Sequence, residues 1–210
     1  MYLSSDVSIT ENLQYLRLGD NNIHTIPSEA LRGLHRLRHL DLRANNISYI
    51  AEDAFYGFGD TITFLNLQKN DIRSLSGLIF ENLNSLETLN LQNNKLTHIS
   101  EDVMEPILDT LRVVDIMDNP LICNCELQWY KNWLSTLKDK DDEMMQKKRT
   151  VCTIQKEHRE YSLQNLPLEK LECVIKSYDS VRLSSSNVNR VGILAQTALS
   201  ICILARMFLA

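Results

Sequence analysis

The sequence predicts an α/β solenoid, in which a stack of similar coils contributes one strand each to a curved parallel β-sheet on the concave face. Two observations predict this fold. One apolar pattern recurs through the first half of the chain at an almost constant period, and four cysteines follow its last copy. Because a stack of coils leaves its last coil open, we expect the cysteine-rich segment to form a disulfide-stapled C-terminal cap.

The recurring pattern is apolar-x-x-apolar-x-apolar-x-x-Asn. It occurs five times, with starts at Leu13, Leu37, Ile62, Leu86 and Leu111. The closing asparagines are 24 or 25 residues apart, and they are Asn21, Asn45, Asn70, Asn94 and Asn119. The alternation inside each copy predicts a short strand with its leucines pointing inward, and an asparagine amide can donate to and accept from the backbone of adjacent coils. Pattern and period resemble those of leucine-rich repeats.

A second apolar set follows each strand and predicts the packing of the opposite side of the coils. In the second copy it includes Ile47, Ile50 and Phe55, and Phe80 recurs at the position of Phe55 one period later. Recurrence at the repeat period favours core packing over a ligand pocket. We therefore expect Phe55 and Phe80 to form an internal aromatic stack.

Four of the five cysteines lie close together, while Cys202 stands alone in an apolar tail. The four are Cys123, Cys125, Cys152 and Cys173. A Cys-x-Cys pair followed by gaps of 26 and 20 residues does not match the paired knuckles of a structural zinc site, so disulfides and an oxidising compartment are favoured. The spacing alone leaves three pairings open.

Residues 119–173 resemble the C-terminal flanking cap (LRRCT) of extracellular leucine-rich-repeat proteins. They contain Asn119-Pro120, then Cys123-Asn124-Cys125, then an apolar stripe at helical spacing and two later cysteines. The stripe consists of Leu127, Tyr130, Trp133, Leu134 and Leu137, with Trp129 at its border. The resemblance implies the disulfides Cys123–Cys152 and Cys125–Cys173.

The two ends of the chain differ from the repeats. Residues 1–12 read as the remnant of a preceding repeat without the apolar core of a secretory signal, so we expect an N-terminal segment to be missing. Repeats are expected over 13–118, the cap over 119–173, a polar stalk over 174–190 and an apolar segment over 191–210. The polar stretch Ser184-Ser185-Ser186-Asn187 before that segment favours attachment of a glycolipid (GPI) anchor there. A transmembrane helix is the alternative, although Gln196 and Arg206 interrupt the run.

Outward-facing strand positions form three columns across the predicted sheet. The first column begins with Tyr15, His39 and Phe64, and rings of this kind are enriched at protein interfaces. We expect a protein-binding patch centred on these three residues and flanked by Arg17, Asp41 and Arg43. The alternative is that they make ordinary cross-strand contacts.

Several functions are disfavoured by composition and motifs. A net charge of -5 offers no overall basic field for nucleic acid. The five histidines are scattered without a catalytic spacing, and no phosphate loop or metal signature occurs, so we expect neither an enzyme nor a cofactor. Asn46-Ile47-Ser48 is an N-glycosylation sequon, which suits an extracellular protein.

The repeats, cap and anchor-like tail together resemble insect chaoptin and connectin and the vertebrate Nogo receptor. That resemblance implies a non-enzymatic protein on the outer side of the plasma membrane, working in cell adhesion or as a co-receptor. Its partners would be extracellular or cell-surface proteins, including a second copy of itself. The alternatives are the ligand-binding ectodomain of a single-pass signalling receptor and, less favoured, an intracellular scaffold with reduced cysteines.

Overall fold

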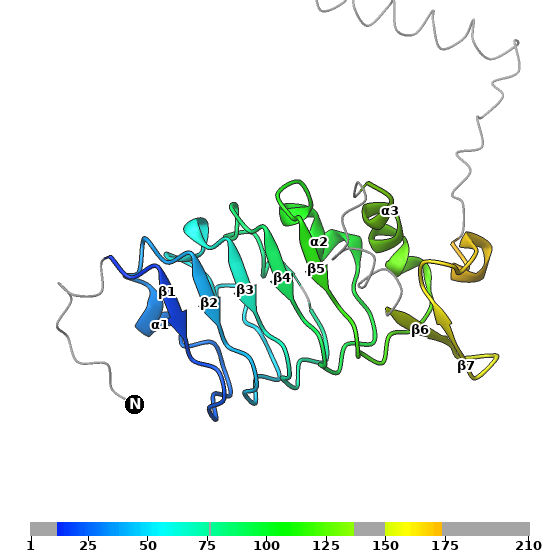
Figure 1. Cartoon of the computed structure of the whole chain (residues 1–210), viewed down its shortest axis with the longest axis horizontal. Coiled ribbons are helices and arrows are strands. Elements are labelled where there is room, and N and C mark those ends of the chain that lie inside the picture. Colours follow the sequence, from blue (N-terminus) through cyan, green and yellow to red (C-terminus); the bar gives the residue numbers. More distant parts are fainter. Residues whose placement is uncertain (1–11, 76, 137–149, 174–210) are drawn as a thin grey trace, which may run out of the picture. The chain divides into compact units, whose positions relative to one another are not determined.

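The computed structural model describes residues 12–75, 77–136 and 150–173, which form stacked coils followed by a cap (Figure 1). The chain divides into two units, residues 1–173 and 174–210, and all described residues belong to the first. The predicted fold class, a solenoid with a parallel sheet and a cap, is confirmed.

Each coil contributes one three-residue strand, and the strands lie side by side in sequence order (Figure 1). They are β1 Tyr15–Arg17, β2 His39–Asp41, β3 Phe64–Asn66, β4 Thr88–Asn90 and β5 Val113–Asp115. All four pairings are parallel and place equivalent residues opposite each other. The middle residues Leu40, Leu65 and Leu89 are completely buried, which is the inward alternation that the pattern predicts.

Short helices and turns connect the strands on the other side of the coils. They include α1 Ser28–Leu31, the 3-10 helix η1 Gly59–Thr61 and α2 Glu101–Leu108. Gly59 is required in η1, because a Cβ there would lie 2.5 Å from the carbonyl oxygen of Asn82 in the next coil.

The aromatic side chains of this side are buried, but the expected ring stack is wrong. Phe55 and Phe80 both lie in the core, with exposed fractions of 0% and 1%. The ring contact of Phe55 is with Phe58 of its own coil, at a centroid distance of 6.0 Å, and the described residues show no ring pair between Phe55 and Phe80. The repeat period predicts which side chains are buried, whereas ring geometry depends on the rotamer that each one adopts.

One asparagine in each coil bonds to the backbone of the coil before it. The Asn70 amide nitrogen donates to the carbonyl oxygens of Leu42 and Leu67, each at 3.0 Å, and its Oδ1 accepts from the Ile47 backbone N–H at 3.0 Å. The same three bonds recur at Asn45, Asn94 and Asn119. We call these four buried side chains the asparagine ladder.

The residue before each closing asparagine has a left-handed backbone, with φ between 50° and 56°. These residues are Asp20, Ala44, Lys69, Asn93 and Asp118. The conformation costs non-glycine residues roughly 1–2 kcal/mol each. The turn persists because it directs the next amide toward buried backbone groups that would otherwise lack partners.

The cap follows β5 and covers the open end of the last coil. It contains η2 Cys125–Leu127, α3 Gln128–Thr136, the antiparallel strands β6 Val151–Ile154 and β7 Arg159–Ser162, and η3 Leu168–Leu171. Two disulfides, Cys123–Cys152 and Cys125–Cys173, tie the start of the cap to β6 and to its end. These are the pairs that the resemblance implies.

Trp129 connects the cap to the coils more directly than the sequence suggests. The sequence predicts Trp129 at the border of the apolar stripe. In the structure the side chain is only 2% exposed, and its Nε1 donates to the carbonyl oxygen of Ile99 at 2.8 Å. Its neighbour Tyr130 is fully buried against Thr150, and this burial raises the pKa of the phenol to about 12. The predicted stripe residue Leu137 lies outside the described residues.

The asparagine ladder leads to a prediction about stability. Replacing Asn70 by Ala leaves the buried Ile47 N–H without its acceptor and removes one of the two amide donors of the Leu42 carbonyl, which keeps Asn45. We therefore expect a loss of about 3 kcal/mol in the free energy of unfolding. Urea denaturation followed by circular dichroism measures this loss.

Asn21 provides the matched control. It is exposed and, within the described residues, bonds only to carbonyls of its own coil, so Asn21→Ala is expected to cost less than about 1 kcal/mol. Equal losses for the two variants would contradict a ladder that joins neighbouring coils.

Candidate functional site

Three aromatic side chains lie in a row on the outer face of the sheet, the face that points away from the leucines. Tyr15, His39 and Phe64 begin β1, β2 and β3 and are paired in register. The His39 and Phe64 rings are stacked, with centroids 4.0 Å apart and planes 4° apart, and the Tyr15 ring lies 5.7 Å from His39. Tyr15 is 66% exposed. We call these three residues the aromatic column.

The pKa of His39 is lowered by this arrangement. Partial burial between its neighbours lowers the pKa of the imidazole, and the positive charge of Arg17 lowers it further. The Asp41 carboxylate acts in the opposite direction, but burial is the larger effect. The surroundings of the central ring of the column therefore favour its neutral form.

The aromatic column ends at the third coil. Thr88 and Val113 occupy the same position in β4 and β5, so the outer face continues with smaller side chains. Farther along the strands the face becomes polar, where Gln68 donates to Gln92 at 2.5 Å and Gln92 donates to Asp118 at 2.8 Å. The aromatic surface is thus confined to the first three coils.

Asp41 has a different role from the one that the sequence suggests. It was expected as an exposed flank of the patch, but only 7% of it is exposed, and its Oδ1 accepts from the Arg43 backbone N–H at 3.0 Å. The side chains at the same position in the next three coils also accept from the backbone N–H of the residue two positions later. These side chains are Asn66, Asn90 and Asp115. These Asp and Asn side chains stabilise the turn after each strand. The recurrence of Asp or Asn at this position was the sequence signal for it.

The two flanking arginines also differ from each other. Arg43 lies across the end of the neighbouring strand, 3.5 Å from a carboxylate oxygen of Asp20, where Gly19 leaves room for it. Arg17 is exposed beside the column, without an ion pair to any described residue. Of the three predicted flanking residues, Arg17 is the one whose charge remains available.

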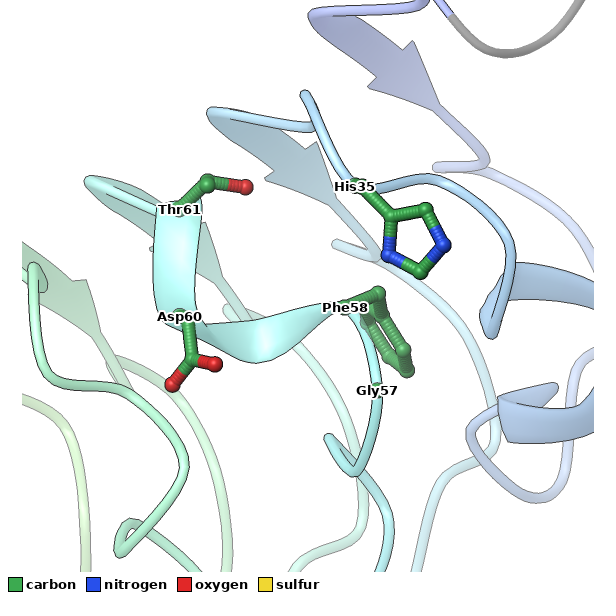
Figure 2. Close-up of a pocket in the computed structure, with 5 residues that line it drawn as sticks. All are labelled: His35, Gly57, Phe58, Asp60 and Thr61. Atoms are coloured by element: carbon green, nitrogen blue, oxygen red, sulfur yellow. The ribbon is translucent and has the colours of Figure 1, made fainter.

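A shallow cavity opens on the edge where the chain enters the strands. It has a volume of about 310 Å³ and is lined by His35, Gly57, Phe58, Asp60 and Thr61. Figure 2 shows the His35 ring above the Phe58 ring and the hydroxyl of Thr61 to the left of His35. A second cavity of about 560 Å³ lies on the same edge, and its lining includes Asn84, Glu87, Asp109 and Arg112. Both cavities are shallow and open to solvent, so side chains of a protein partner could enter them.

The remaining sequence predictions concern glycosylation, metal binding and membrane attachment. Asn46 and Ser48 of the glycosylation sequon are exposed. No cluster of His, Cys, Asp and Glu within residues 12–75, 77–136 and 150–173 could hold a metal ion. In the same ranges no helix has the length and apolar character needed to cross a membrane. The predicted anchor residues Ser184, Ser185, Ser186 and Asn187 lie outside the described part of the chain.

Comparison with known proteins agrees with this architecture. A family model described as "Leucine rich repeat" matches residues 11–61 and 60–121, which is more than half of the chain. The Leucine-rich repeat-containing G-protein coupled receptor 5A of Xenopus laevis is 49% identical over 45 residues, which are 21% of this chain and 5% of that receptor. From this match and from its five stacked coils, the chain belongs to the leucine-rich-repeat family, whose repeat domains generally bind other proteins.

Proposed function

We propose that this chain is a non-enzymatic cell-surface protein that binds other proteins through the aromatic column, in cell adhesion or as a co-receptor. The observation that carries the proposal is the row of three rings in register, with Tyr15 66% exposed at its end. Exposed aromatic side chains are unfavourable in water, and they provide large contact areas with few rotatable bonds at interfaces. Stacking orders the rings before a partner arrives, which lowers the entropic cost of binding.

The cap supports a location outside the cell. Two disulfides close it, and disulfides persist in oxidising compartments. We assign residues 13–118 to the repeats and 119–173 to a cap of the LRRCT kind, as in surface proteins of the chaoptin, connectin and Nogo-receptor type. The exposed sequon at Asn46 is the proposed site of an N-linked glycan.

A receptor ectodomain is the second candidate. The relative from Xenopus laevis is named as a G-protein coupled receptor, and this favours a ligand-binding segment of a signalling protein. The aromatic column would then receive a ligand instead of a surface on another cell. Both functions place the contact on the same outer face of the sheet.

Substitution of the column tests the binding surface. Cells that display the full chain are expected to cluster with each other or with untransfected cells, and Tyr15→Asp combined with Phe64→Asp is expected to abolish clustering, because each carboxylate would be desolvated in the contact. Tyr49→Asp is the control, since Tyr49 is 57% exposed away from the column. Unchanged clustering in the double variant would refute the proposed surface.

The pKa of His39 tests whether the column persists in solution. An NMR titration is expected to give a pKa below 6.5, and Phe64→Ala is expected to raise it because the imidazole becomes more hydrated. Since the folded-state pKa lies below the unfolded value, this histidine contributes stability above pH 6.5 that is lost as the pH falls below it. A midpoint at or above 6.5 in the unmodified chain contradicts the stacked geometry, and Tyr49→Ala should leave the midpoint unchanged.

Membrane attachment is a separate part of the proposal. The composition of residues 174–210 supports a lipid anchor in the region of Ser184 to Asn187. Phosphatidylinositol-specific phospholipase is expected to release the chain from intact cells, measured by immunoblot of the medium, whereas heat-inactivated enzyme releases none. Retention after treatment would count against the anchor and favour a transmembrane helix.

A further inference from the structure

Basic residues are concentrated where the first coil passes into the second, although acidic residues are more numerous in the chain as a whole. Residues 32–43 contain four arginines and one acidic residue, although the whole chain has 27 acidic and 22 basic residues. The later coils have the opposite composition, since residues 81–118 contain eight acidic and two basic residues. The stack therefore carries positive charge beside the aromatic column and negative charge beyond it.

Three arginines at this end have no carboxylate partner among the described residues. Arg17, Arg36 and Arg38 are exposed, and their guanidinium groups form no salt bridge or hydrogen bond with a described residue. By contrast, Arg32 pairs with Glu29 at 2.8 Å, and Arg43 lies beside Asp20. The charges of the first three are thus available to a partner.

The three arginines lie close to the residues of the aromatic column along the chain. Arg17 lies two residues after Tyr15 in β1 and is close enough to affect the charge state of His39. Arg38 directly precedes His39, and its carbonyl oxygen accepts from the backbone N–H groups of Thr63 and Phe64. Arg36 lies two residues before Arg38 and directly follows His35, which lines the cavity of Figure 2. Exposed rings and exposed arginines thus come from the same segments of the first two coils.

We propose that this combined surface, Tyr15, His39 and Phe64 with Arg17, Arg36 and Arg38, binds a short acidic segment of a protein partner that also carries apolar side chains. The proposal rests on the function proposed above and specifies the chemistry of the partner. Guanidinium groups bind carboxylates through two parallel hydrogen bonds, and exposed rings favour an apolar contact. One segment with both kinds of side chain satisfies both demands.

A long polyanion fits this surface less well than a short acidic segment. The basic region spans only the first coils, and a sulfated polysaccharide that continued along the sheet would approach Asp115 and Asp118 in the acidic coils. Such a chain would also leave the exposed Tyr15 ring with little apolar contact. Because the basic region is short, it is complementary in charge to a short acidic segment of a protein.

Selection from a phage library of random 12-residue peptides tests this inference. Phage are selected on cells that display the full chain, after depletion on cells that display the Tyr15→Asp, Phe64→Asp double variant. Peptides enriched by the column are expected to contain more Asp and Glu than the starting library, together with apolar residues. Enriched peptides that are neutral or basic would overturn the proposed partner class.

Charge reversal provides the stricter test. The triple variant Arg17→Glu, Arg36→Glu, Arg38→Glu is expected to weaken binding of the acidic peptides by at least about tenfold and to select basic peptides instead. The matched control is Arg73→Glu with Lys95→Glu, since both residues are exposed on the edge where the chain leaves the strands. Equal affinity of the acidic peptides for the unmodified and triple-variant chains would contradict the role of the three arginines.

The outcomes separate this inference from the function on which it rests. If column-dependent peptides are selected but carry no excess of acidic residues, the acidic partner is wrong and the binding surface stands. If no peptide distinguishes the unmodified chain from the Tyr15, Phe64 variant, the binding surface itself fails. Binding of heparin that depends on the three arginines, without acidic peptides, would overturn the proposal in favour of a sulfated polysaccharide.

Discussion

The fold depends on side-chain amides that satisfy the buried backbone of two coils at once. Burial of leucines is favourable but non-directional, so it cannot by itself determine how one coil is placed against the next. Asn70 removes that freedom, because its amide bonds to Leu42 and Ile47 in the preceding coil and to Leu67 in its own. An error in placement would leave these groups unpaired in an apolar interior, which is far more costly than a small loss of leucine contact.

The aromatic column is a consequence of this alignment. Because equivalent residues lie opposite each other in β1, β2 and β3, three rings separated by 24 and 25 residues in the chain come into contact. Exposed arginines of the first two coils lie close to these rings along the chain, and Arg17 acts on the pKa of His39. The register of the core thus determines which outward positions become neighbours. The side chains at these positions determine the chemistry of the surface and so the kind of partner that it can bind.

The sequence predicts the stack, the strands and the outward columns because each follows from the repeat period. It does not predict what depends on a single contact. Asp41 belongs to an outward column, but its carboxylate is occupied by the turn at Arg43. Trp129 lies at the border of a helical stripe, yet its indole reaches Ile99 in the coils. The sequence also does not show whether an arginine has an ionic partner. Arg32 pairs with Glu29, whereas Arg36 forms no salt bridge with a described residue.

Unequal repeat lengths have a further consequence for the edge of the solenoid. The second and fourth coils each contain one residue more than their neighbours, and the strands remain aligned, so the additional residue is accommodated between strands. In the second coil it falls at η1, where Gly59 packs against the backbone of the next coil, and in the fourth it falls just after α2. The two hollows lie beside these segments. Single-residue differences in repeat length therefore change the surface at this edge while the strands stay aligned.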